Sequence, residues 1–158
     1  MFAAIKDADA VYANLAAGGK GIADIVSMAK TVVAMMDKAG IKRLIWISSI
    51  GIYNEVPGKF GEWNTKILGD YLVNYRKAAD VIEGSDLDYT VIRPAWLTNK
   101  DEVDFEITTK NEPFRGTEVS RKSVAAEVVK LLLNPADEVH ESIGLDKPGT
   151  DGDKPAWM

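Results

Sequence analysis

The stretch Leu44-Ile-Trp-Ile-Ser-Ser-Ile-Gly-Ile-Tyr53 decides the fold. It is a run of apolar and β-branched residues that follows the basic pair Lys42-Arg43 and passes into two serines and a glycine. This pattern predicts a parallel strand that is buried on both faces. Ligands of open α/β sheets bind beyond the carboxyl ends of the strands. We therefore expect Ser48 and Ser49 to lie where a ligand would be held.

Upstream of this strand the sequence predicts a strand and a helix. A last helical turn over residues 1–6 precedes a strand over residues 10–15 and a glycine-rich connection, Gly18-Gly-Lys-Gly21. The apolar residues that follow recur at helical spacing up to Gly40, a residue suited to the left-handed end of a helix. Together with the Leu44 strand, these segments predict a right-handed βαβ unit.

Downstream, residues 51–63 are rich in glycine and proline and predict a loop. One helix is expected after it, capped by Asn64 or Thr65 and continuing to about Glu83. It would be the second crossover of the sheet. Its inner face is expected to contain Ile67, Tyr71, Tyr75, Ala78, Ala79 and Ile82.

Three more strands are expected in the second half of the chain. Residues 88–93 form a strand that Pro94 ends, because proline cannot donate a hydrogen bond to a central ladder. Residues 103–108 alternate with period two, which predicts an edge strand, and residues 141–145 form a last short strand. A helix is expected between these last two strands. Ser120 caps its start, and it ends before a proline. Its inner face is expected to contain Val124, Val128, Leu131 and Leu132.

Composition limits the class of protein. A chain of 158 residues that is 46% hydrophobic and 27% charged predicts one compact domain over residues 1–158. Alternating strands and helices predict an α/β fold with a doubly wound parallel sheet. The net charge of -5 argues against nucleic acid or an anionic membrane as partner.

The residue types also restrict location and metal chemistry. The absence of cysteine, of a signal peptide and of a long apolar run favours a cytoplasmic protein. The single histidine, His140, leaves no histidine metal cluster and no serine-histidine-aspartate triad, and is expected at the surface. The acidic run over residues 101–104 lacks the spacing of a calcium loop, so no metal site is predicted.

Four segments resemble one family in its order and at its spacing. They are Asp9-Ala-Val-Tyr-Ala-Asn-Leu-Ala16, Lys42-Arg-Leu-Ile-Trp-Ile-Ser-Ser49, Leu87-Asp-Tyr-Thr-Val-Ile-Arg-Pro94 and Ser120-Arg-Lys-Ser-Val-Ala125. They resemble strands and the late helix of atypical short-chain dehydrogenases/reductases, the NmrA-like group with NAD(P)-binding Rossmann folds. The resemblance implies NADP or NAD as cofactor, a small carbonyl or hydroxyl substrate, and a small substrate-side region at about residues 96–158.

One departure from the family pattern is large. The family's glycine-rich fingerprint between its first strand and helix is absent, because nothing ahead of Asp7 could hold it. Gly18-Gly-Lys-Gly21 has neither the dinucleotide spacing nor the serine or threonine of a phosphate loop. We therefore expect a fold that is incomplete at its N-terminus. Without a helix N-terminus to hold the pyrophosphate, these 158 residues alone should bind NAD(P) weakly or not at all.

The resemblance implies that Ser48, Ser49 and Tyr71 correspond to the serine and tyrosine of the reductase active site. In complete enzymes of the family, a lysine four residues after the tyrosine lowers the pKa of the phenol by its positive charge. Here that position is Tyr75, and the cations that follow it are rotated away from the Tyr71 face. Packing against the sheet therefore stays open as an alternative role for both tyrosines. For the two serines the alternative is backbone capping at the strand end.

The resemblance also implies cofactor-binding residues. Asn14, Leu15 and Ala16 end the first strand, where the family contacts the adenosine side of the cofactor; Asn14 closing a turn is the alternative. The segment Arg93-Pro94-Ala95 resembles the one that flanks the nicotinamide, with an ion-paired arginine at a strand end as alternative. Trp96, just past that strand, either packs or walls a ligand pocket.

Three hypotheses of function follow. The first is an NAD(P)-dependent oxidoreductase. The second is a cofactor-binding sensor or regulator without turnover, which the missing lysine permits. The third is a remnant that self-associates as a homo-oligomer through the helices of residues 22–39 and 64–83.

Overall fold

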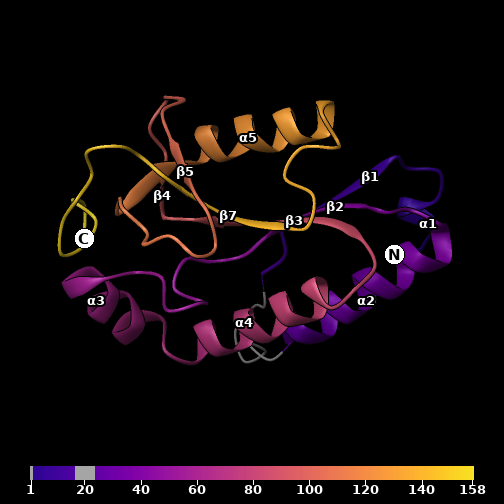
Figure 1. Ribbon diagram of the computed structural model, residues 1–158, viewed down its shortest axis with the longest axis horizontal. Helices are drawn as coiled ribbons and strands as arrows, with labels where there is room; N and C mark the ends of the chain where they lie inside the picture. Colours follow the sequence, from indigo (N-terminus) through magenta and orange to yellow (C-terminus); the bar gives the residue numbers. More distant parts are fainter. Residues whose placement is uncertain (1, 17–23) are drawn as a thin grey trace.

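The computed structural model describes residues 2–16 and 24–158, and its centre is a five-stranded sheet (Figure 1). The strand order is β1-β2-β3-β7-β5. Four strands are parallel, and β5 pairs with β7 in the antiparallel direction at the edge. A second, two-stranded parallel sheet pairs β4 with β6. The bounds are β1 Ala10–Ala13, β2 Arg43–Ile47, β3 Asp88–Pro94, β4 Trp96–Thr98, β5 Glu106–Thr108, β6 Glu118–Ser120 and β7 Glu141–Asp146.

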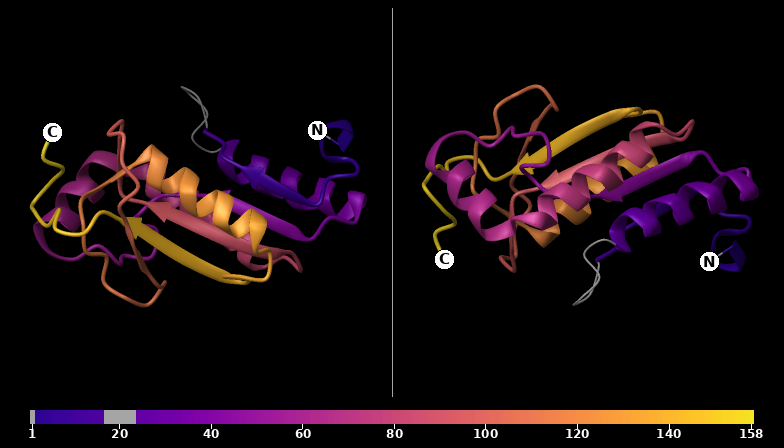
Figure 2. Two further views of the ribbon diagram at one scale, coloured as in Figure 1. Left: turned by 90° about the horizontal axis from the view of Figure 1, so that it is seen from above. Right: turned by 90° about the horizontal axis from the view of Figure 1, so that it is seen from below.

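Helices cover both faces of the main sheet, which confirms the predicted α/β class with a mostly parallel sheet. Helices α2 and α4 lie side by side on one face, and α5 crosses the other (Figure 2). The short α1 precedes β1, and α3 leads into α4. Their bounds are α1 Phe2–Ile5, α2 Asp24–Ala39, α3 Gly58–Leu68, α4 Asp70–Glu83 and α5 Arg121–Leu133.

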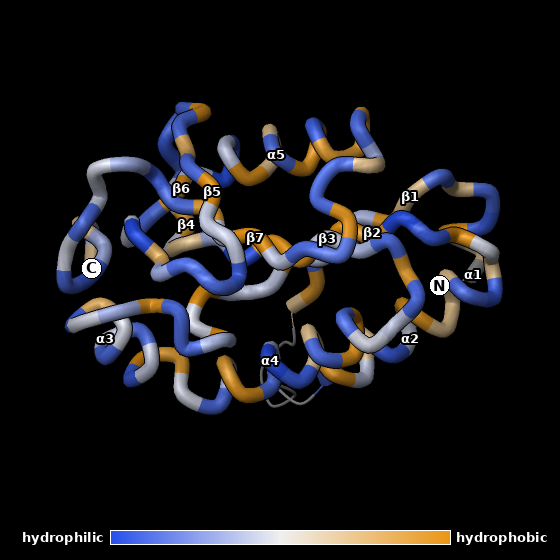
Figure 3. Tube along the Cα trace, viewed as in Figure 1, coloured by the Kyte–Doolittle hydropathy of each residue, from blue (hydrophilic) through white to orange (hydrophobic). Residues whose placement is uncertain are grey.

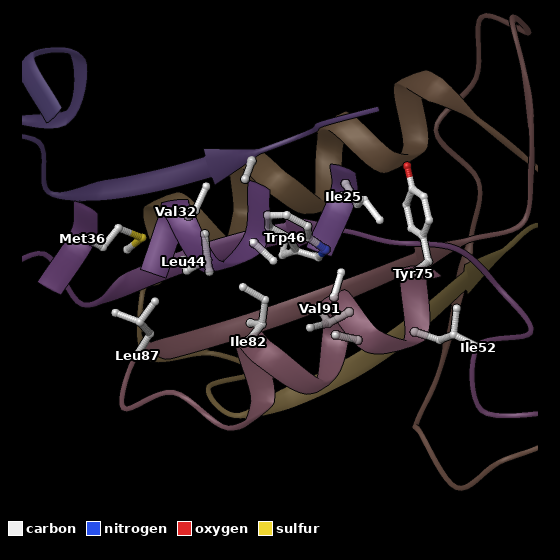
Figure 4. Close-up of a cluster of buried hydrophobic side chains, with 14 of the residues drawn as sticks. Ile25, Val32, Met36, Leu44, Trp46, Ile52, Tyr75, Ile82, Leu87 and Val91 are labelled. Atoms are coloured by element: carbon white, nitrogen blue, oxygen red, sulfur yellow. The ribbon is translucent and has the colours of Figure 1, made fainter. Parts of the chain in front are cut away.

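Strand β2 is buried on both faces, as its apolar run predicts. Leu44 and Trp46 pack into the core beneath α2 and α4, where Ile25, Met36 and Ile82 are also fully buried (Figure 4). The intervening Ile45 belongs to the core on the α5 side, with Ile92, Ile143 and Leu131. Side chains alternate between the two faces of the sheet, and both faces are covered by helices. This explains why every residue from Leu44 to Ile47 is apolar. Figure 3 shows apolar segments along these strands between the helical layers.

The strand register brings three predicted positions to one edge of the sheet. Ala13 is paired with Trp46, and Ile47 is paired with Ile92. Asn14, Ser48 and Arg93, each the residue that follows one of these positions, therefore lie at the same carboxyl end of neighbouring parallel strands. The convergence expected from the sequence is present in the backbone.

The loop and single helix expected over residues 51–83 are wrong in two respects. Helix α3 begins at Gly58, inside the expected loop, and Gly69, with φ +47°, separates it from α4. Gly61 was expected in the loop but lies within α3. A Cβ atom at this position would be 2.0 Å from the carbonyl oxygen of Val56, so only glycine fits. The break at Gly69 leaves Ile67 51% exposed instead of buried. Neither Asn64 nor Thr65 is a cap, because both lie inside α3, whose N-cap is Pro57.

The other element boundaries differ less. The first strand ends at Ala13, and the edge strand β5 begins only at Glu106. Leu132, expected in the core, is 42% exposed. Ser120 caps α5 as predicted, because its side chain accepts a hydrogen bond from the Ser123 N–H. The connection Gly18-Gly-Lys-Gly21 lies outside the described residues.

Candidate functional site

A cavity of about 330 Å³ opens at the carboxyl ends of β2 and β3. It receives residues from the end of β2, the junction of α3 and α4, the β3–β4 segment, the start of α5 and the C-terminal tail. Six of its lining residues were predicted as site residues from the sequence: Ser48, Ser49, Tyr71, Pro94, Ala95 and Trp96. The other lining residues are Ile50, Leu68, Leu97, Arg121 and Trp157.

The two serines differ in what their hydroxyl groups do. Ser48 closes the strand end through its backbone, which donates to the Ile92 carbonyl at 2.7 Å. Its side chain is 6% exposed, and its Oγ has no hydrogen-bond partner among the described residues. The Ser49 hydroxyl instead donates to the neighbouring Ile50 carbonyl. An unpaired buried hydroxyl is unfavourable, so Ser48 Oγ is a candidate for a ligand partner at this edge.

Tyr71 reaches the cavity from the first turn of α4. Its ring stacks on Tyr75, with centroids 3.9 Å apart and planes inclined by 21°. Burial, and secondarily the Tyr75 hydroxyl, raise the pKa of Tyr71 above its ordinary value. Tyr71 is therefore a neutral phenol at physiological pH, which suits a hydrogen-bond donor or general acid and excludes a standing tyrosinate base.

Tyr75 occupies the position of the family's lysine but points elsewhere. Its side chain is 3% exposed, and its hydroxyl donates to the Leu15 carbonyl at 3.2 Å, which ties α4 to the end of β1. Arg76 does not replace the lysine, because its guanidinium lies over the Tyr53 ring and pairs with Asp80. The groups that shift the pKa of Tyr71 include no cation.

Indole rings form one wall of the cavity. The Trp96 Nε1–H donates to Asn64 Oδ1 at 2.9 Å, which fixes the ring. The Trp63 ring packs against the Trp96 ring with centroids 4.9 Å apart. The Trp157 ring meets the Trp96 ring edge-on, with centroids 6.3 Å apart. Trp157 is half exposed, so the tail supplies the outer part of this wall. Trp96 was predicted here from the sequence, whereas the contributions of Asn64 and Trp157 were not.

Arg93 does not line the cavity. Its guanidinium is fully buried, pairs with Glu55 and donates to the Ser142 hydroxyl and carbonyl. The Glu55 carboxylate also accepts from the backbone N–H groups of Gly51 and Tyr53. Arg93 thereby holds the loop that follows Ser48 and Ser49. Pro94 and Ala95, next in the chain, do line the cavity.

The first strand contributes its end but none of the cavity lining. Asn14 and Ala16 are exposed, and Leu15 is partly buried against the core below α4. Their backbone continues the same carboxyl edge, one strand away from Ser48. The structure thus brings the predicted nicotinamide-side residues together and leaves the predicted adenosine-side residues beside them.

The cavity has the general properties of a small-molecule site. It is a concave site with mostly apolar walls and a few polar groups, as small-molecule sites usually are. Pro94, Ala95 and Leu97 supply apolar lining, and Ser48, whose buried Oγ has no partner among the described residues, lines the same space. The residues present therefore fit the reacting end of a dinucleotide.

Topology and site together define a Rossmann-like nucleotide-binding protein, with the ligand at the strand ends of a doubly wound sheet. Comparison with known proteins places the chain within that class. A family model described as NAD(P)H-binding matches residues 1–135. The chain belongs to this NAD(P)H-binding family, whose cofactor is NAD(P).

Three similar proteins illustrate the relationship. The UPF0659 protein YMR090W of Saccharomyces cerevisiae is 32% identical over 149 residues, and the match covers 90% of this chain and 64% of the yeast protein. The uncharacterized sugar epimerase YhfK of Bacillus subtilis is 30% identical over 166 residues, covering 97% and 68%. A short-chain dehydrogenase/reductase from Veillonella parvula, solved in complex with NADP, is 29% identical with a TM-score of 0.88, covering 98% and 70%. The chain thus spans about two thirds of the length of the curated relatives.

Proposed function

We propose that this chain is part of an NAD(P)-dependent oxidoreductase of the atypical, NmrA-like group of short-chain dehydrogenases/reductases that acts on a small carbonyl or hydroxyl compound. One observation carries the proposal: Ser48, whose buried hydroxyl has no partner among the described residues, and Tyr71, a neutral phenol, both line one cavity at the carboxyl ends of β2 and β3. Two hydroxyl-bearing residues at one cavity suit a carbonyl oxygen that becomes negative during reduction.

The reduction can be balanced with these groups. Bound NAD(P)H supplies a hydride. In the substrate, a C–H bond forms at the carbonyl carbon while the π electrons of C=O move to the oxygen. Ser48 Oγ and Tyr71 donate hydrogen bonds to that oxygen, and Tyr71 transfers its proton and recovers one from water. Oxidation of a hydroxyl compound is the reverse, and the sugar-epimerase description of the Bacillus subtilis relative is compatible with such a substrate.

The remaining predicted residues receive supporting roles in this proposal. Pro94, Ala95 and Trp96 contact the nicotinamide side, and Arg93 positions the loop beneath it through Glu55. Asn14, Leu15 and Ala16 contact the adenosine side. Residues 96–158 form a substrate-side region, since Trp96, Arg121 and Trp157 reach the cavity from there.

The proposal includes a pyrophosphate cradle contributed from outside these 158 residues. In support, the relatives are longer than this chain and none of its own segments has a dinucleotide glycine spacing. Without the cradle, the affinity of these residues for NADP should be millimolar rather than micromolar, because phosphate contacts at a helix N-terminus supply much of dinucleotide binding.

The proposed reaction is tested by isotope transfer. The chain is incubated with an aromatic aldehyde and millimolar NADPH that carries deuterium at the transferable C4 position, and the alcohol is analysed by mass spectrometry. We expect deuterium on the carbinol carbon, at a rate that the Ser48→Ala substitution lowers. If NADPH binds but no deuterium is transferred above the protein-free rate, hydride transfer is excluded.

That negative result would favour the second candidate, a sensor or regulator that binds the dinucleotide without turnover. The observation that favours this candidate is Tyr75, whose hydroxyl is bound to the Leu15 carbonyl where a lysine would serve catalysis. A self-associating remnant is the third candidate, and a molar mass in solution that corresponds to one chain would contradict it.

Location in a cytoplasm is part of the same proposal. Its support is the absence of cysteine from the chain. Across residues 2–16 and 24–158, no helix has the length and apolar character needed to cross a membrane.

A further inference from the structure

Arg121 differs from the basic residues around it in its partners. Lys100, Lys122 and Lys147 each pair with a carboxylate, at 2.5, 2.6 and 2.6 Å respectively. Arg121 makes no ion pair with a carboxylate among the described residues, and its Nη1 donates only to the neutral Asn99 amide oxygen at 2.7 Å. Arg121 is exposed, so its guanidinium is hydrated, and within the part of the chain that the structure describes it has no carboxylate partner that a ligand would have to displace.

The position of Arg121 gives that charge a target. It is the first residue of α5, where the helix dipole adds positive potential, and its side chain lines the same cavity as Ser48. Ser48 also lines this cavity, and its Oγ is buried and lacks a partner among the described residues. The cavity thus has a guanidinium available for an anion in its lining and an unpaired hydroxyl in its wall.

The rest of the lining is apolar and aromatic. Trp96, Trp157, Leu68 and Leu97 surround the same space, and no aspartate or glutamate lines it. A guanidinium binds a carboxylate through paired N–H donors, and indole rings favour flat apolar groups. The lining therefore matches a molecule with a planar apolar body and one anionic end.

We infer that Arg121 binds the carboxylate of the substrate, which makes the substrate a flat, preferably aromatic, carbonyl compound with a carboxylate. This inference rests on the proposed function, because it assigns the carbonyl to Ser48 and Tyr71. With the carboxylate on Arg121 and the ring against Trp96, the carbonyl is directed to the floor of the cavity. Arg121 is then a specificity-determining residue, separate from the residues proposed for the chemistry.

The test compares a charged with a neutral probe. The probes are 4-formylbenzoate and methyl 4-formylbenzoate, which share the aldehyde and ring and differ in the charge. Binding to the whole chain is followed by NMR, through the indole N–H signals of Trp96 and Trp157, and needs no cofactor or turnover. We expect the anion to bind about tenfold more tightly than the ester, as a charge-assisted hydrogen bond provides.

The variants assign that preference to one side chain. Arg121→Gln should remove the preference and leave ester binding unchanged, while Arg121→Lys should retain part of it. The matched control is Lys122→Gln, which removes the adjacent cation, one that pairs with Asp101 and does not line the cavity. It should leave the preference intact.

Two results would overturn the inference. In the first, Arg121→Gln leaves the preference for the anion unchanged. In the second, the substitution weakens NADP binding and not the binding of 4-formylbenzoate, which would assign the guanidinium to a cofactor phosphate. Failure of the proposed function is distinguishable, because an anion preference that depends on Arg121 but comes without deuterium transfer would show a ligand site without the reductase reaction.

Discussion

Replacing Arg93 by methionine should lower the free energy of unfolding by about 3–5 kcal/mol, the usual cost of leaving one member of a buried ion pair without its partner. The side chains of Arg93 and Glu55 are 0% and 3% exposed. Methionine fills similar volume but removes the charge, so Glu55 keeps its backbone donors while its negative charge remains buried. Chemical denaturation followed by circular dichroism measures the change.

A double-mutant cycle and a surface control make this prediction specific. Adding Glu55→Gln to Arg93→Met should restore part of the loss, so the two single effects should sum to more than the double effect. Arg115→Met is the control, because Arg115 pairs with Glu106 at 3.1 Å but is 55% exposed, and its loss should cost less than about 1 kcal/mol. Additive effects at Arg93 and Glu55 would contradict a coupled pair.

The ion pair also connects stability to the site. Glu55 binds the backbone of Gly51 and Tyr53, in the loop that directly follows Ser48 and Ser49. Loss of Arg93 should therefore loosen the floor of the cavity as well as the core. This explains why an arginine at a strand end can matter for ligand binding without lining the pocket.

Substituting Tyr71 by phenylalanine should lower the rate of hydride transfer by about 100-fold, the lower range for loss of a positioned general acid. The ring and its stacking on Tyr75 remain, so dinucleotide affinity should not change. Because the pKa of Tyr71 is raised, the wild-type rate should show no increase from phenol ionisation as the pH rises through neutrality. Single-turnover rates with a binding titration separate the two quantities.

Tyr75→Phe is the matched control, since it removes the same atom one helical turn away. That hydroxyl binds the Leu15 carbonyl and is no part of the cavity lining, so the rate should remain near wild type. The stability should fall by about 1 kcal/mol, as for one ordinary hydrogen bond. An unchanged rate for Tyr71→Phe would identify Tyr71 as a packing residue, the alternative that its lack of a neighbouring lysine left open.

The sequence was informative where local pattern and topology act together. A continuous apolar run predicts a parallel strand, and neighbouring parallel strands end at the same edge of a sheet. Ser48, Pro94 and Ala95 could therefore be placed in one site from the sequence. The cap at Ser120 was also readable, because capping depends on residues three positions apart. Such features need only neighbours in the chain.

The missed features depend on contacts between distant segments. Trp157 and Arg121 reach the cavity from the tail and from α5, and nothing in their local sequence records that approach. Gly61 was interpreted as a loop residue, although its role is to let α3 lie against the Val56 carbonyl. An ion pair was one of the two roles expected for Arg93, but its partner Glu55 is 38 positions away and could not be identified from the sequence.

The most direct test of the account is an NMR titration of this chain with NADP, because the central claim is that the nicotinamide end binds at the carboxyl ends of β2 and β3. We predict shifts concentrated at Ser48, Ser49, Tyr71 and Trp96, with a millimolar dissociation constant. A micromolar constant would refute the proposed outside cradle. Shifts concentrated at the opposite strand ends, around Lys42 and Asp88, would contradict the site itself.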